Sequence, residues 1–244
     1  MFVSVINGFK GDEALISLME VFYTLILFVW VLIVVQMISK GVYEVAAKKW
    51  EHYVGVYFAR KTIHILAGGL VAFVIAWLNL FSTPILPFLL GVILAAFCYL
   101  PRRTGKLMEW FQDPNNMYEV NFCLIWSIIM GLSWLVAGGD FWLGTVPILF
   151  MAWGDGITGI VRNFVFKKRT KHWIGNVAMF LLCAPLAYFL GFGVGGVIAA
   201  LIASMIEHIE KIGGKFVDDN ITVPVSSFIV LSLFTLLNVP YVSP

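Results

Sequence analysis

Eight apolar segments, each close to the length of a membrane-spanning helix, divide the chain. They cover approximately residues 21–38, 62–80, 84–100, 120–137, 141–161, 173–190, 192–206 and 223–239. A helix that crosses the bilayer core needs roughly 20 mainly apolar residues. Only 12% of the residues are charged, whereas a soluble domain carries about twice that share. We therefore expect an all-α, polytopic integral membrane helical bundle of about eight transmembrane helices, forming a single membrane domain over residues 1–244.

Basic residues gather on one side when the chain is threaded through these eight segments. Fifteen of the 16 Lys and Arg fall there, and only Lys10 falls on the other side. The fifteen are Lys40, Lys48, Lys49, Arg60, Lys61, Arg102, Arg103, Lys106, Arg162, Lys167, Lys168, Arg169, Lys171, Lys211 and Lys215. The positive-inside rule predicts that this side is cytoplasmic, which places both termini outside. Most of the polar residues discussed below lie on the same side, so we expect an active site that faces the cytoplasm.

Asp155 lies within the fifth apolar segment, between Gly154 and Gly156. An acid in lipid costs a few kcal/mol, so Asp155 is expected to face a metal, a cation or water. The flanking glycines allow a ligand or another backbone to approach, and the alternative is a polar contact between packed helices. Residues 154–159 match the pattern GxGxxG, but no strand precedes them, which excludes a dinucleotide fold.

Two groups of cations accompany this acid. Arg60, Lys61 and His64 fall within about one helical turn, where they can bind phosphate oxygens or else mark a membrane edge. The basic loop from Arg162 to Lys171 can cradle a triphosphate or attract anionic headgroups. Gly175 and Asn176 follow this loop, and the free N–H groups at the start of a helix can also face an anion.

The stretch Asp218-Asp219-Asn220-x-Thr222 precedes the eighth segment. Carboxylate oxygens, water and substrate phosphates are the ligands that Mg²⁺ prefers. Capping of the following helix explains one of these polar residues, but two acids and an asparagine exceed what a cap requires. Glu207, at the end of the seventh segment, is a further acid on the same side of the membrane.

These motifs together resemble the polyprenol kinase family of dolichol, phytol and farnesol kinases. The resemblance covers most of the chain from Arg60 onwards. It departs from the family pattern Lys-Ser/Thr-x-Glu-Gly, because His172 follows Lys171 and Ile174 precedes Gly175 here. The matching pieces are Arg60-Lys61-x-x-His64, Gly154-Asp155-Gly156-x-x-Gly159, Lys171-x-x-x-Gly175-Asn176, Glu207 and Asp218-Asp219-Asn220-Ile221-Thr222-Val223-Pro224.

The resemblance implies a membrane kinase that transfers the γ-phosphate of a nucleoside triphosphate, typically CTP, to a lipid alcohol such as dolichol. The expected partners are this alcohol, the nucleotide, membrane lipids and Mg²⁺ or another divalent cation, with no nucleic acid. Asp155, Asp219 and His64 are the expected catalytic residues. Substitution of Asp155 or Asp219 by Asn is expected to reduce the rate by orders of magnitude without unfolding the protein. Metal ligands are expected among Asp155, Asp218, Asp219 and Glu207. Nucleotide contacts are expected from Arg60, Lys61, Arg162, Lys171, Gly154, Gly156, Gly175, Asn176, Asn220 and Thr222.

Two other functions remain open from the sequence. The Gly-Asp and Lys-x-x-x-Gly motifs also occur in CDP-lipid synthases, which are cytidylyltransferases that release pyrophosphate. An ion-coupled transporter would use Asp155 as an acid in its ion pathway. A transporter is expected to carry charged residues at several depths, whereas those of this chain gather on one side.

Overall fold

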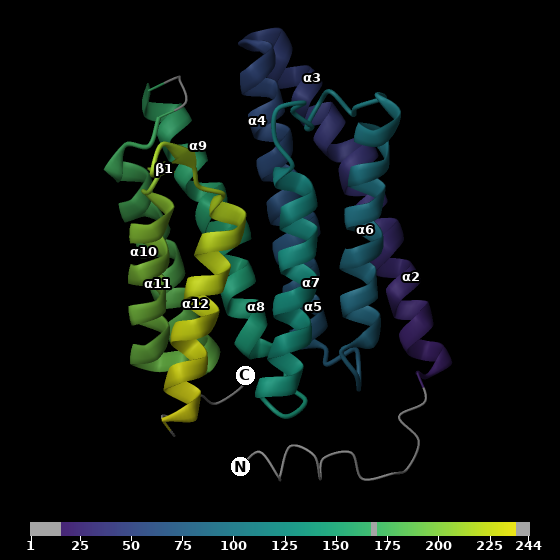
Figure 1. The fold of residues 1–244 in the computed structure, drawn as a ribbon, viewed down its shortest axis with the longest axis vertical. Helices are drawn as coiled ribbons and strands as arrows, with labels where there is room; N and C mark the ends of the chain where they lie inside the picture. Colours follow the sequence, from purple (N-terminus) through teal and green to yellow (C-terminus); the bar gives the residue numbers. More distant parts are fainter. Residues whose placement is uncertain (1–15, 167–169, 238–244) are drawn as a thin grey trace.

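The computed structural model describes residues 16–166 and 170–237, which form an upright bundle of helices (Figure 1). A hairpin of two two-residue strands is the only sheet in these residues, so the predicted all-α class is confirmed. The order of elements is α2 (Leu18–Ile33), η1 (Val34–Ile38), α3 (Ser39–Lys49), α4 (His52–Ile63), η2 (His64–Gly69), α5 (Leu70–Trp77), α6 (Ile85–Thr104), α7 (Tyr118–Val136), α8 (Trp142–Leu149), η3 (Phe150–Gly154), α9 (Asp155–Phe166), α10 (Trp173–Ala187), η4 (Tyr188–Phe192), α11 (Gly193–Glu207), β1 (Lys211–Ile212), β2 (Lys215–Phe216) and α12 (Asp219–Leu236), where η marks a π-helical segment.

Seven helices in the described residues are long and apolar enough to cross a membrane. One of them, Trp173–Glu207, has 35 residues and contains a sharp break. Gly191 has φ 87° and Gly193 has φ 50°, values that glycine adopts without the steric cost of a side chain. Helices α10 and α11 pack against each other on either side of this break (Figure 1). They correspond to the sixth and seventh predicted segments. The seven long helices therefore account for all eight predicted apolar segments.

The first two helices extend further than their apolar segments. The first runs from Leu18 to Lys49, and its 32 residues span about 48 Å, well beyond the roughly 30 Å bilayer core. The second begins at His52, ten residues before the apolar segment predicted from 62. The ends of α3 and α4 therefore project from the bundle together, as Figure 1 shows. Hydropathy marks only the part of a helix that lipid surrounds, and both helices continue beyond that part.

The helix that contains Asp155 lies in the middle of the bundle. All eight residues of α8 are buried, and α5, α7 and α12 pack around it. A side chain at Gly144 would collide with the Ile129 carbonyl, and one at Gly154 would collide with the Cys183 sulfur. The small residues thus allow α8, η3 and α9 to lie at the centre. Asp155 consequently faces protein and not lipid.

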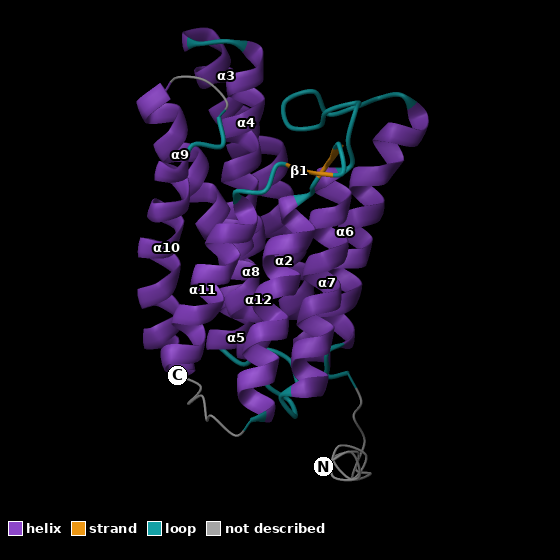
Figure 2. Ribbon diagram, turned by 60° about the vertical axis from the view of Figure 1, so that its left-hand side comes forward, coloured by secondary structure: helices purple, strands orange, loops and turns teal. Residues whose placement is uncertain are grey.

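The helix ends that border the predicted cytoplasmic loops all lie at one end of the bundle. Figures 1 and 2 show the α3–α4 and α6–α7 connections there, together with the β1–β2 hairpin that joins α11 to α12. Twelve of the fifteen clustered basic residues fall within the described ranges, and Lys167, Lys168 and Arg169 lie outside them, as does Lys10. The grouping of the loops agrees with the predicted threading, whereas the cytoplasmic orientation and the placement of the termini remain predictions.

Candidate active site

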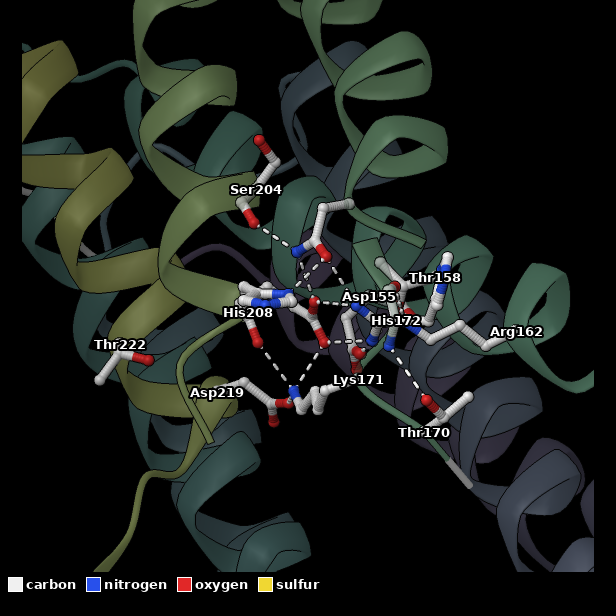
Figure 3. Close-up of polar contacts among 12 residues, drawn as sticks. Asp155, Thr158, Arg162, Thr170, Lys171, His172, Ser204, His208, Asp219 and Thr222 are labelled. Carbon is white, nitrogen blue, oxygen red and sulfur yellow. Dashed lines mark hydrogen bonds and ion pairs between the residues drawn. The ribbon is translucent and has the colours of Figure 1, made fainter. Parts of the chain in front are cut away.

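Three carboxylates from three different helices meet at this end of the bundle (Figure 3). Asp155 is the first residue of α9, Glu207 is the last of α11 and Asp219 is the first of α12. One ligand oxygen from each lies within 4.8 Å of the other two, a spacing that suits a single metal ion. Asp155 and Glu207 are buried, whereas the Asp219 side chain is 28% exposed. The carboxyl group of Asp219 therefore lies on the open side of the site.

Three cations lie between these acids. Lys61 forms an ion pair with Asp155. Lys171 Nζ donates to Glu207 Oε1 at 2.6 Å and to Asp219 Oδ2 at 3.0 Å. Arg162 donates from Nη1 and Nη2 to the two Glu207 oxygens at 2.8 and 2.9 Å. Three negative and three positive charges balance, which is the condition under which charges tolerate burial. The cluster thus combines carboxylate oxygens that could hold a metal ion with cations of the kind that attract phosphate oxygens.

Arg162 is held firmly by the protein itself. Its Nε donates to the His172 carbonyl at 2.8 Å, and Nη2 donates to Asn176 Oδ1 at 2.8 Å in addition to Glu207. Gly175 leaves the room that the guanidinium fills, because a side chain there would collide with Arg162. Arg162 was predicted to bind phosphate, but the structure commits its donors to Glu207 and the start of α10. It therefore positions Glu207.

Asn176 continues this network. Its Nδ2 donates to the Ser204 carbonyl at 2.6 Å and to Glu207 Oε2 at 2.8 Å, and its Oδ1 contacts His208 Nδ1 at 3.0 Å. The expected role of Gly175 at a free helix start is not what the structure shows. The Gly175 N–H donates to the His172 carbonyl, and the Ile174 N–H donates to His172 Nδ1. These groups fix the helix start and are not directed at an anion.

Lys171 and Asp219 form the accessible part of the cluster. The Lys171 side chain is 24% exposed, against 1% for Glu207. Burial lowers the pKa of the Lys171 ammonium, but the nearby charges of Asp219 and Glu207 outweigh it and raise that pKa above its ordinary value. Lys171 is therefore a fixed positive charge at neutral pH. An anionic ligand that approaches the cluster meets Lys171 before it meets the other two cations.

The two adjacent aspartates before α12 have different roles. Asp218 caps the helix, since its Oδ1 accepts from both the N–H and Nδ2 of Asn220 at 3.0 Å. Its Oδ2 accepts from Asn121 Nδ2 at 2.7 Å, and burial raises the pKa of its carboxyl group. Asp218 does not belong to the three-carboxylate group. The sequence left both Asp218 and Glu207 as candidate metal ligands, and the structure places Glu207 in the group.

Asn220 and Thr222, both predicted to contact nucleotide, make their hydrogen bonds within the start of α12. The Thr222 hydroxyl donates to the Asp218 carbonyl at 3.3 Å and lies apart from the cluster in Figure 3. Asn220 is buried next to the cap, and its Oδ1 has no hydrogen-bond partner in the described part of the chain. These side chains shape the start of α12, which in turn places Asp219.

The three residues of the predicted cation group also have different contacts. They are Arg60, Lys61 and His64. Lys61 contacts Asp155, whereas the Arg60 guanidinium lies 5.2 Å from the centre of the Tyr118 ring. His64 Nδ1 lies 3.8 Å from Asp155 Oδ2 and lacks a hydrogen-bond partner in the described residues. The imidazole of His64 therefore stands at the edge of the cluster, next to the acid at its centre.

Gly154 and Gly156, predicted to contact nucleotide, serve helix packing. A side chain at Gly154 would meet Cys183 and Met179, and one at Gly156 would meet Ile65 at 3.2 Å. Their small size allows the central helix to approach its neighbours, so the glycines help to place Asp155.

Several residues of the site escaped sequence reasoning. Thr158 donates to the Asp155 carbonyl at 2.8 Å, and its spacing of three residues on one helix was an available signal. His208 follows Glu207 directly, and this polar pair at a helix end was also visible. Asn121 holds Asp218 across 97 positions of sequence, so no local pattern could identify it.

The fold and the site define a polytopic membrane protein with a mixed acid and cation cluster at one end of its bundle. Phytol kinase of Synechocystis sp. is 30% identical over 189 residues, covering 70% of this chain and 76% of that protein. A probable chloroplastic phytol kinase of Triticum aestivum is 30% identical, and the match covers 72% of this chain and 66% of the relative. A probable chloroplastic phytol kinase of Glycine max is 29% identical, and the match covers 72% of this chain and 64% of the relative. The chain thus belongs to the polyprenol and phytol kinase family.

This chain spans somewhat less than two thirds of the soybean and wheat relatives. No protein-family model matches the chain, and no solved structure matches it either.

Proposed function

We propose that this protein is a membrane kinase that transfers the γ-phosphate of a nucleoside triphosphate to the hydroxyl group of a polyisoprenoid alcohol. The observation that carries the proposal is the convergence of Asp155, Glu207 and Asp219 with Lys61 and Lys171 at one end of an apolar bundle. Phosphoryl transfer requires positioning and neutralisation of charge more than covalent help from the protein. The similarity to phytol kinases supports the same reaction class.

A divalent cation, with Mg²⁺ as our choice, fits the three carboxylates. Their oxygens lie within 4.8 Å of one another, and hard oxygen ligands are those that Mg²⁺ prefers. Asp155 and Asp219 are the proposed ligands. Glu207 lies beside them and accepts hydrogen bonds from Arg162. The ion would supply neutralisation of charge on the triphosphate. Because Lys171 contacts two of the acids, we expect its ammonium to move onto a phosphate oxygen when nucleotide binds.

The reaction forms a bond between the alcohol oxygen and the γ-phosphorus and breaks the bond from that phosphorus to the β–γ bridging oxygen. The nucleoside diphosphate leaves, and the hydroxyl proton passes to a base at the site. Asp155 and His64, 3.8 Å apart, are the candidates for that base. Lys61 and Lys171 would stabilise the charge that develops on the transferred group and on the diphosphate.

CTP is the proposed donor, on the strength of the motif resemblance, and the cytoplasm is the proposed side, on the strength of the basic loops. The deciding experiment incubates purified protein in detergent with Mg²⁺, γ-labelled CTP or ATP, and phytol, geranylgeraniol, farnesol or dolichol. Label in a lipid phosphate that disappears with EDTA is the expected result. In a parallel incubation with a lipid phosphate as the acceptor, release of labelled pyrophosphate would instead identify a cytidylyltransferase. Absence of labelled lipid phosphate with every alcohol would refute the proposal.

A further inference from the structure

An apolar pocket lies beside the acid cluster, lined by residues of α2, η1, α6, α7 and the helix formed by α4, η2 and α5. Val31, Leu90, Leu94 and Trp126 contribute to its apolar lining. Its polar lining residues are Arg60, His64 and Glu119. His64 belongs both to this pocket and to the edge of the cluster, since its Nδ1 lies 3.8 Å from Asp155 Oδ2. The pocket and the proposed reaction site therefore share His64 at their common edge.

Two polar atoms of the lining residues lack partners in the part of the chain that the structure describes. They are His64 Nδ1 and Glu119 Oε2, and both residues are more than nine-tenths buried. The other oxygen of Glu119 accepts hydrogen bonds from Arg102 and from Gln112 Nε2, the latter at 3.0 Å. Leaving a buried polar atom without a partner is unfavourable, so such atoms indicate a group that is still to bind. Both atoms can accept a hydrogen bond, which suits a donor such as a hydroxyl group.

The polar residues lie together at the cluster end of the pocket lining, at Arg60 and His64 in α4 and η2 and at Glu119 near the start of α7. From His64 to Val71 the lining extends over seven residues, about 10 Å along the helix axis. This arrangement is amphipathic, with a hydrophilic end against the cluster and an apolar body that points into the bundle. It matches a molecule with one small polar group on a hydrocarbon chain.

We propose that this pocket binds the hydrocarbon chain of the lipid alcohol, with the hydroxyl group donating to His64 Nδ1 beside Asp155. The assignment rests on the proposed kinase function, which requires an alcohol next to the metal-bound nucleotide. Glu119 is paired with Arg102 through Oε1, and its free Oε2 can accept a hydrogen bond from a neutral hydroxyl or a water molecule. The lining of about 10 Å contacts only the part of the chain nearest the hydroxyl.

A photolabelling experiment locates the chain directly. The probe is geranylgeraniol with a diazirine on the isoprene unit next to the hydroxyl, added to the full-length protein in detergent with and without excess unlabelled alcohol. We expect labelled peptides from 67–71 in η2 and α5, 90–94 in α6 and 122–126 in α7, suppressed by the competitor. Labelling confined to outward-facing residues, or labelling that the competitor leaves unchanged, overturns the proposal.

A matched pair of variants tests the pocket by volume. Leu94 lines the pocket, whereas Ile93, its neighbour in α6, is 46% exposed and does not. Leu94→Trp should raise the KM for the alcohol at least about tenfold and leave the KM for nucleotide unchanged, because it fills only the chain site. Ile93→Trp adds the same indole to the lipid-facing side and should match the wild type. A normal alcohol KM in Leu94→Trp contradicts the assignment.

The two experiments separate this inference from the kinase proposal. Suppressible labelling of the pocket without phosphorylation of any alcohol would remove the kinase proposal and keep the binding site. Phosphorylation of an alcohol with labels elsewhere and a normal Leu94→Trp would keep the kinase and remove the site. Elution from a size-exclusion column shows whether Leu94→Trp is folded. If it is not, the photolabelling result alone decides whether the pocket binds the alcohol.

Discussion

Replacing Asp219 by Asn and Asp155 by Asn should have similar effects on activity but different effects on stability. Both carboxylates belong to the proposed metal site, so each substitution should reduce turnover at least about 100-fold, the scale of losing one charge-stabilising group. From the sequence alone both variants are expected to fold. The different surroundings of the two acids predict different losses of stability for the two variants.

Asp155 forms an ion pair with Lys61, and the side chains are only 7% and 10% exposed. Asparagine there leaves a buried ammonium without its partner, a loss of about 3–5 kcal/mol. The Asp219 side chain is 28% exposed, and its partner Lys171 also contacts Glu207. Asparagine at 219 removes a partly solvated pair and leaves Lys171 paired, which costs about 1 kcal/mol or less. Asp219→Asn is therefore the informative variant for catalysis.

The assay measures transfer of γ-label from nucleotide to a prenol at a series of Mg²⁺ concentrations, with thermal unfolding followed in the same detergent. We expect Asp219→Asn to unfold near the wild-type temperature, to need more Mg²⁺ and to turn over slowly. Asp155→Asn should unfold at a clearly lower temperature. Near-normal turnover and Mg²⁺ dependence of Asp219→Asn would refute the metal assignment, and equal thermal stability of the two variants would refute the reasoning from burial.

Three further outcomes are expected. Arg162→Ala leaves the buried Glu207 with fewer partners and should destabilise the protein by about 3–5 kcal/mol, measured as a fall in unfolding temperature against wild type. Gly159→Ala should also lower the unfolding temperature, because its methyl group would overlap Tyr57, whereas Gly41→Ala has open space around it and should be neutral or slightly stabilising. A single cysteine in the β1–β2 hairpin should react with a membrane-impermeant thiol reagent only from the cytoplasmic side. Reaction from the outside would show that the predicted orientation in the membrane is wrong.

Much of the fold was predictable because apolar length and charge are local properties. The eight apolar segments correspond to helices of the bundle, and the loops that carry most of the basic residues lie at one end. The break at Gly191 was visible as a glycine between two apolar segments. The helix limits were less predictable, since α3 and the first part of α4 continue beyond the apolar residues.

The candidate site was predictable in its residue types but not in its pairings. Asp155, Asp219 and Glu207 were all candidates, and the structure brings them together. By sequence, Asp218 or Glu207 was a further candidate beside Asp155 and Asp219. The residue that holds Asp218 outside the group is Asn121, 97 positions earlier in the sequence. The assignment of Arg162 to Glu207 likewise depends on two helices that are 45 residues apart.

The amino-acid sequence by itself determined that this chain forms membrane helices and which polar groups lie at their ends, because hydrophobic length and charge act residue by residue. Only the tertiary structure decided that α8 and α9 occupy the centre, which acid pairs with which cation, and that a pocket reaches His64. Those features arise from close packing between distant segments, where glycines such as Gly144 and Gly154 set how near two helices come. Such contacts have no signature in any single stretch of sequence.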